Sequence, residues 1–175
     1  MNNDAHAYDA RNVSVLRVGP EFAAAALAIV REAAAWARGQ DIEVWSDAEL
    51  SDQDFHEEAR LGQLVMGFSG RQAAATMLLQ PSDPLYWPTI APNTSLYLHK
   101  IAVRRTFAGA GWPARLIEFA VNAAADRGLR WLRLDTLFRP ALQTLYERQG
   151  FKALDEPPLL VRGRRMIRMA RELCR

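Results

Sequence analysis

The segment that most constrains the fold is residues 96–116, LYLHKIAVRRTFAGAGWPARL. An apolar strand pattern leads into a short basic turn, a loop of small residues and a helix start with Pro113 in its first turn. A glycine loop between a strand and a helix exposes backbone N–H groups, and the helix dipole adds positive charge there. The segment therefore predicts either an anion site or, more simply, a tight turn before a helix.

A dinucleotide is the first ligand to consider for this loop. Residues 109–114, GAGWPA, match the glycine fingerprint of dinucleotide-binding folds, and Asp135 ends the next predicted strand, where an acid would bind ribose. In those folds the first glycine follows its strand almost at once, whereas residues 104–108 intervene here. Too little chain also follows the loop to build the second half of a doubly wound sheet. These two features argue against a dinucleotide site.

Hydrophobic periodicity and turn residues predict alternating strands and helices along the chain. The predicted elements are strand 13–18, helix 21–38 with Trp36 on its apolar face, a short helix after the capping-box pair Ser46 and Glu49, strands 63–69, 72–80 and 95–103, helix 112–127, strand 131–137, helix 140–149, and strands 151–156 and 164–173. This order predicts a mixed α/β sheet with helices packed on it, in one domain over residues 1–175. Residues 1–11 are expected to be a loose lead-in.

The composition is that of an ordinary soluble protein, with 50% hydrophobic and 24% charged residues. The first twelve residues are polar and do not resemble a signal peptide, and the longest apolar run, residues 22–30, is too short to span a membrane. Cys174 is the only cysteine, so an intrachain disulfide is excluded. We therefore expect a cytoplasmic protein without a membrane partner.

A nucleic-acid partner is not expected, because the net charge is only +2. The predicted last strand and the turn before it carry four arginines that are expected to alternate with apolar residues, namely Arg162, Arg164, Arg165 and Arg168. This arrangement is typical of a strand with one buried face rather than of a basic patch.

Residues 96–151 resemble the core of the GNAT superfamily of acetyl-CoA-dependent N-acyltransferases. The resemblance lies in the strand ending IAV, the glycine loop that opens a helix, the strand WLRLD and the segment ALQTLYERQGF. It implies a GNAT-like α/β (α+β) fold with a single mixed, mostly antiparallel sheet and helices on both faces. It also implies an acyltransferase that uses acetyl-CoA as acyl donor, with no metal.

In that family the glycine loop binds the pyrophosphate of the cofactor, and the end of the preceding strand binds the pantetheine arm. The residues in these positions here are Ile101, Ala102, Val103, Ala108, Gly109, Ala110, Gly111, Trp112, Pro113 and Ala114. Ala108 stands where the family has Arg or Gln, Pro113 where it has Gly or Ala, and Arg139 where many members have a cofactor-binding asparagine. Pro113 lacks an N–H and therefore removes one phosphate donor.

The resemblance also implies a general acid, Tyr146, which occupies the position of the family's catalytic tyrosine. From the residues alone, Tyr146 would be a core side chain on the apolar face of its helix. Acyl transfer to an amine also needs a base, for which His99 and Asp135 are candidates, or a water molecule could serve. A single histidine in an apolar strand is more often structural than catalytic.

The acceptor is expected to be a primary amine on a small molecule or peptide that attacks the thioester directly in a ternary complex. Cys174 is too near the C-terminus for an acyl-enzyme. The acidic stretch 41–62 with Trp45 could border the acceptor, although it is more simply a solvated face. The proline-rich loop 81–94 carries Tyr86 and Trp87, which could equally wall a substrate pocket or cover the core.

The departures at Ala108, Pro113 and Arg139 leave a second function open. The chain could be a catalytically degenerate GNAT fold that binds acyl-CoA as a sensor or binds a protein partner. For either function we expect a monomer or a homodimer.

Overall fold

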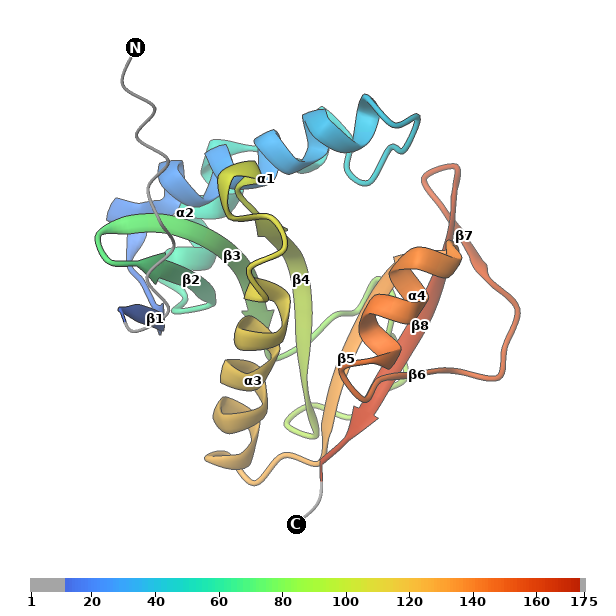
Figure 1. Cartoon of the computed structure of the whole chain (residues 1–175). Coiled ribbons are helices and arrows are strands. Elements are labelled where there is room, and N and C mark those ends of the chain that lie inside the picture. The colour runs from blue at the N-terminus through green and yellow to red at the C-terminus, as the bar shows by residue number, and fades with distance from the viewer. Residues whose placement is uncertain (1–11, 174–175) are drawn as a thin grey trace. The chain divides into compact units, whose positions relative to one another are not determined.

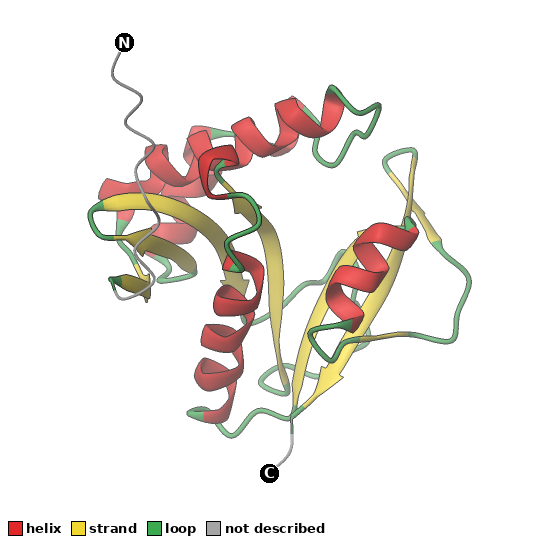
Figure 2. Cartoon of the chain, in the orientation of Figure 1, coloured by secondary structure: helices red, strands yellow, loops and turns green. Residues whose placement is uncertain are grey.

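The computed structural model describes residues 12–173 and contains a mixed sheet with helices (Figures 1 and 2). The strands are β1 (Val13–Arg17), β2 (Leu64–Ser69), β3 (Gln72–Gln80), β4 (Ser95–Val103), β5 (Trp131–Leu137), β6 (Lys152–Ala153), β7 (Leu159–Val161) and β8 (Arg164–Glu172). The helices are α1 (Ala23–Arg38), α2 (Asp52–Arg60), α3 (Trp112–Ala125) and α4 (Pro140–Glu147), with 3-10 turns η1 (Pro20–Phe22), η2 (Asp47–Glu49) and η3 (Arg105–Phe107). The strand order is β1-β2-β3-β4-β5-β8-β6, and β7 pairs with β8.

The chain divides into two compact units that alternate along the sequence. The first contains the residues up to Thr76 together with Ala102–Leu116, and the second contains Met77–Ile101 together with the residues from Ile117 onward. The glycine loop belongs to the first unit, whereas His99, Asp135 and Tyr146 belong to the second. The single-domain organisation over residues 1–175 stays a prediction.

In the first unit, helix α1 packs on α2, and β1 pairs with β2 in antiparallel register. The core face of α1 is made of small and branched side chains that are nearly fully buried, including Leu27, Ile29 and Val30. Trp112, at the start of α3, is fully buried, and its ring lies against the backbone of Gly67 in β2. Only glycine fits at position 67, because the indole occupies the place of a Cβ atom.

In the second unit, β4 and β5 pair in parallel, and β8 pairs antiparallel with β5, β6 and β7. Helix α4 contacts β5 and β6. The parallel register runs from Ser95 opposite Trp131 to Leu98 opposite Leu134. Two residues beyond Leu98, Lys100 has a φ of 53°, a left-handed conformation that interrupts regular strand geometry.

The predicted elements are confirmed with three differences. The capping box at Ser46 and Glu49 exists, but it begins the turn η2, and α2 starts at Asp52 after its own cap, Ser51. The predicted strand 151–156 is reduced to β6, and β7 was not predicted, because three residues after two prolines are too short to show alternation. Trp36, expected on the apolar face of α1, is 48% exposed and stacks under the Arg105 guanidinium. The predictions for residues 1–11 and for Cys174 lie outside the described residues.

The contact between Gly67 and Trp112 predicts a cost for any added side chain. A Cβ at position 67 would lie 2.7 Å from Cε3 of the indole and closer still to Cζ3. We expect Gly67→Ala to lower the free energy of unfolding by about 1–3 kcal/mol, as overpacking does in other cores. Urea unfolding measures this change. In a Trp112→Phe background, where the outer ring is removed, the same alanine should cost less, and equal costs in both backgrounds would contradict the packing argument.

Candidate active site

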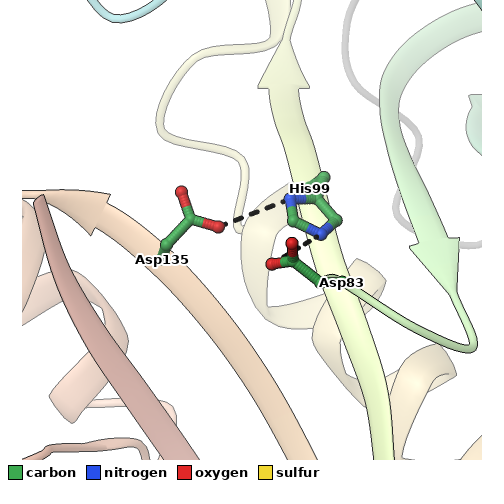
Figure 3. Close-up of side chains that lie close together, drawn as sticks. All are labelled: Asp83, His99 and Asp135. Atoms are coloured by element: carbon green, nitrogen blue, oxygen red, sulfur yellow. Dashed lines mark ion pairs between the residues drawn. The ribbon is translucent and has the colours of Figure 1, made fainter. Parts of the chain in front are cut away.

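The candidate site in the second unit begins where the parallel pairing of β4 with β5 ends. His99 follows Leu98, and Asp135 follows Leu134, so the two residues after the last paired position carry polar side chains. Nδ1 of His99 lies 3.5 Å from Oδ1 of Asp135. The sequence named both as candidate bases, and the structure brings them together (Figure 3).

A third residue, Asp83, completes the cluster from the other side of the imidazole. Figure 3 shows Asp83 near Nε2 of His99 and Asp135 near Nδ1, and Nε2 lies 3.5 Å from Oδ2 of Asp83. Asp83 lies in the proline-rich loop and was not predicted, because an aspartate before a proline in a loop is typical of a turn. We call Asp83, His99 and Asp135 the carboxylate–histidine cluster.

The cluster is buried, and three of its four facing atoms lack a hydrogen-bond partner. The side chains of Asp83, His99 and Asp135 are 6%, 19% and 9% exposed. Oδ2 of Asp83, Nε2 of His99 and Oδ1 of Asp135 are buried without a hydrogen-bond partner. A separation of 3.5 Å is longer than a hydrogen bond of normal length, as is common for catalytic groups before a substrate binds.

The surroundings shift the proton affinities of the cluster. Burial lowers the pKa of His99, an effect that the charge of Asp83 opposes and that of Lys100 reinforces. Burial, together with the charge of Asp83, raises the pKa of Asp135 to about 7. Burial disfavours the charged form of each group. Because the pKa of Asp135 is about 7, this carboxyl can take up or release a proton near neutral pH.

The three side chains could also hold a metal ion, since one ligand atom from each lies within 4.8 Å of the others. A single ion can bind only one imidazole nitrogen, whereas the two carboxylates face different nitrogens. An imidazolium, which donates from both nitrogens, fits this arrangement better than one ion does. The expectation of a metal-independent site stays a prediction.

Tyr146, on α4, is half-buried and packs edge-to-face on Phe151, with ring centroids 6.1 Å apart. Burial and the nearby charge of Asp135 raise the pKa of its phenol above the usual value. Tyr146 therefore keeps its proton at any working pH, which the role of a proton donor requires. Tyr146 is thus half-buried rather than in the core position that periodicity suggested, and it lies close enough to Asp135 to respond to the charge of that carboxyl.

The glycine loop in the first unit has the conformation that its composition predicts. Gly109 and Gly111 have φ values of 80° and 75°, which residues with a Cβ rarely adopt. The amides of Ala108 and Ala110 donate to backbone carbonyls inside the segment, at 3.2 and 3.3 Å. Nη1 of Arg115 donates to the Ala110 carbonyl at 2.5 Å, so the guanidinium folds back along the loop.

The basic turn before the loop is held by Glu32 of α1, which the sequence did not indicate. Its carboxylate accepts the Arg105 backbone N–H at 2.7 Å and lies 3.3 Å from Nη1 of Arg104. Nε of Arg104 also donates to the Ala73 carbonyl at 2.9 Å. These arginines therefore brace the turn that leads into the loop.

The other predicted residues lie at the ends of their elements. Ile101 closes the second unit's part of β4, while Ala102 and Val103 belong to the first unit. Ala102 is buried, and Arg104, the first residue after β4, donates its backbone N–H to the Ala74 carbonyl of β3. Arg139 is the exposed N-cap of α4, and its backbone carbonyl accepts hydrogen bonds from the backbone N–H groups of Leu142 and Gln143.

Two other expectations concern the surroundings of the site. Tyr86 and Trp87 are 8% and 3% exposed, so they cover the core of the second unit. Arg168 pairs with Glu156 and also donates to the Tyr86 carbonyl, as expected of an arginine with a structural role on its strand. Among residues 12–173, no helix is long and apolar enough to cross a membrane.

Comparison with known proteins assigns the family. A family model described as an acetyltransferase (GNAT) domain matches residues 38–173. The chain is 30% identical over 127 residues to YesJ of Bacillus subtilis (strain 168), an uncharacterized N-acetyltransferase, and this alignment covers 68% of the chain and 70% of YesJ. The chain belongs to the GNAT acetyltransferase family and is an acyltransferase, so the resemblance seen in the sequence is confirmed.

Solved structures agree with this fold. A GNAT-family acetyltransferase from Listeria monocytogenes 4b F2365 has a TM-score of 0.76 and 21% identity, covering 92% of this chain and 95% of that one. The PaiA N-acetyltransferase from Thermoplasma acidophilum, solved in complex with coenzyme A, has a TM-score of 0.71 and 14% identity, covering 91% and 98%. At these identities the likeness confirms the mixed, mostly antiparallel GNAT fold.

The raised pKa of Asp135 predicts how stability depends on pH. Between about pH 4, the usual range of the carboxyl, and about pH 7, the folded chain binds this proton more tightly than the unfolded chain does. The contribution of this proton to the free energy of unfolding is therefore fully present below about pH 4 and is lost as the pH rises to about 7. A pKa shift of about three units makes this contribution roughly 4 kcal/mol.

Asp135→Asn should remove this component. The variant's free energy of unfolding should therefore rise relative to the parent as the pH increases from 4 to 7, and urea unfolding at half-unit pH steps would measure the difference. Asp155→Asn, at an exposed position of the same unit, is the control. Parallel pH curves for the parent and Asp135→Asn would refute the shift.

Proposed function

We propose that the protein transfers an acetyl group from acetyl-CoA to a primary amine of a small molecule or peptide, by direct attack in a ternary complex. The observation that carries this proposal is the buried carboxylate–histidine cluster, in which Asp135 exchanges a proton near neutral pH. A base with a pKa near 7 is suited to removing the proton of an attacking amine near neutral pH. Family membership supports acetyl transfer in general.

Acetyl-CoA is proposed as the donor because the chain is a GNAT acetyltransferase and because PaiA was solved with coenzyme A. In the glycine loop, Ala108 and Ala110 use their amides internally, and Pro113 has none. The pyrophosphate would therefore be bound by the remaining amides of the loop and of the first helical turn, namely Gly109, Gly111, Trp112 and Ala114. Ile101–Val103 would accompany the pantetheine arm, as in the family.

Between the two candidate bases, the geometry favours Asp135. Carboxylates flank both nitrogens of His99, which leaves neither directed at a substrate, whereas Asp135 has a second oxygen. We assign Asp135 as the group that takes the proton of the attacking amine, with His99 behind it. Tyr146 then protonates the departing thiolate, whose basicity is of the same order as that of a phenol.

The donor assignment predicts binding and turnover that can be measured separately. We expect calorimetry to show acetyl-CoA and CoA binding at one site, and a panel of primary amines with thiol detection to show CoA release. Mass spectrometry after acetyl-CoA alone should show no acetylated chain. Binding without turnover on every amine would favour the acyl-CoA sensor, and an acetylated intermediate required for turnover would contradict direct attack.

The acid role of Tyr146 predicts the effect of removing one oxygen atom. Tyr146→Phe should lower kcat by roughly 100-fold or more, the usual contribution of a general acid, because the thiolate would leave unprotonated. The dissociation constant of acetyl-CoA should stay within a factor of two, and the unfolding midpoint should confirm that the fold is intact. An unchanged kcat would remove Tyr146 from the mechanism.

A further inference from the structure

Asp83 has a role that neither the family assignment nor the proposed chemistry includes. Its two carboxylate oxygens differ in their hydrogen bonding. Oδ1 accepts the backbone N–H of Tyr86 at 3.1 Å, which closes a turn of the proline-rich loop. Oδ2 is buried, has no hydrogen bond and faces Nε2 of His99 at 3.5 Å. A turn cap needs only one oxygen, so the buried second oxygen requires another explanation.

The loop that carries Asp83 is held firmly in the second unit. The Trp87 backbone N–H donates to the Asp83 carbonyl at 2.9 Å, and the Trp87 indole packs against Tyr97 of β4 with centroids 6.2 Å apart. The guanidinium groups of Arg133 and Arg168 lie 4.7 and 5.2 Å from the centroid of the same indole. The loop is thereby fixed to β4, which carries His99, to β5, which carries Asp135, and to β8.

The fixed position of Asp83 determines which hydrogen bonds the imidazole of His99 can donate. A neutral imidazole has one N–H and can donate to only one of the two carboxylates, whereas an imidazolium donates to both. With Asp83 at Nε2 and Asp135 at Nδ1, an added proton would satisfy every facing atom of the cluster. The cluster can therefore accept one proton, which would give His99 a hydrogen bond to each carboxylate.

We propose that Asp83 is a positioning residue that acts through His99, orienting the imidazole and stabilising its protonated form so that Asp135 can accept the proton of the acceptor amine. This proposal rests on the proposed function. In the step, the nitrogen lone pair of the amine attacks the thioester carbonyl carbon, and an N–H proton is transferred to Asp135, its bonding electrons staying on nitrogen. The C–S bond then breaks, and the departing thiolate takes the proton of Tyr146. The proton on Asp135 passes to Nδ1 of His99, and Asp83 balances the imidazolium charge.

Other charged groups face the cluster and enter its pH dependence. Lys100 disfavours a proton on His99 and on Asp135, and Arg164 of β8 acts in the same direction on Asp135. Tyr146 of α4 is close enough to respond to the charge of Asp135. These groups stay in place when Asp83 is replaced, so a change in pH dependence on replacement reports the Asp83 charge.

The test is Asp83→Asn, which keeps an oxygen for the Tyr86 N–H but removes the charge. We expect kcat/KM to fall 10- to 100-fold with the acetyl-CoA dissociation constant unchanged. The acidic limb of the pH profile should move to lower pH, because loss of the Asp83 charge lowers the pKa of Asp135. A residue that only caps a turn would not move that limb. Asp126→Asn, exposed in the same unit, is the matched control.

An NMR titration tests the contact without any catalysis. The chain has three histidines, and His99→Gln assigns the His99 ring signals. In Asp83→Asn the imidazole pKa should be lower than in the parent, since the Asp83 charge raises it. If that variant does not fold, Asp83→Ser supplies the same measurement, because its hydroxyl can still accept the Tyr86 N–H.

The two proposals fail in different ways. An unchanged His99 titration in a folded Asp83 variant overturns the positioning role even if the enzyme is active. A changed titration in a chain that acetylates no amine confirms the contact and overturns the proposed function. An unshifted acidic limb in an active Asp83→Asn enzyme overturns the catalytic part of the Asp83 role.

Discussion

The end of the parallel pairing between β4 and β5 is the constraint on which the candidate site depends. Up to Leu98 and Leu134 the two strands satisfy each other's backbone groups, and beyond them Lys100 leaves regular strand geometry. The next residues, His99 and Asp135, therefore come together at the end of a ladder whose apolar side chains exclude water. Their altered proton affinities are a consequence of this position, because burial is the largest cause of both shifts.

Most elements could be predicted from the sequence because each depends on local signals. Pro113, Pro140 and Gly128 mark helix ends by their own backbone restrictions, and the valine and leucine runs give strands whatever their partners. Trp36 was misplaced because helical spacing cannot distinguish a core contact from a ring that stacks on a guanidinium. β7 was missed because it owes its existence to β8 rather than to its own composition.

Only some residues of the candidate site could be predicted, because the others depend on contacts between distant parts of the chain. His99, Asp135 and Tyr146 lie in motifs whose spacing carries information, whereas Asp83 and Glu32 act on partners that are distant along the chain. Such contacts leave no periodic signal, since a turn-forming aspartate and a helical glutamate look the same with or without a partner. Sequence reasoning also left the choice between His99 and Asp135 open, and that choice depends on which nitrogens are already occupied.

The energetics of Asp135 favour a functional origin for the cluster over a structural one. Its raised pKa means that the folded chain is destabilised by ionising this carboxyl near neutral pH, by roughly the free energy of a three-unit shift, about 4 kcal/mol. An asparagine or a leucine at this position would avoid that cost, as replacements of buried charges often do. Repulsion between the charges of Asp83 and Asp135 is part of this cost. A need for a base that works near neutral pH at this position explains why the chain keeps a carboxyl that destabilises the folded state.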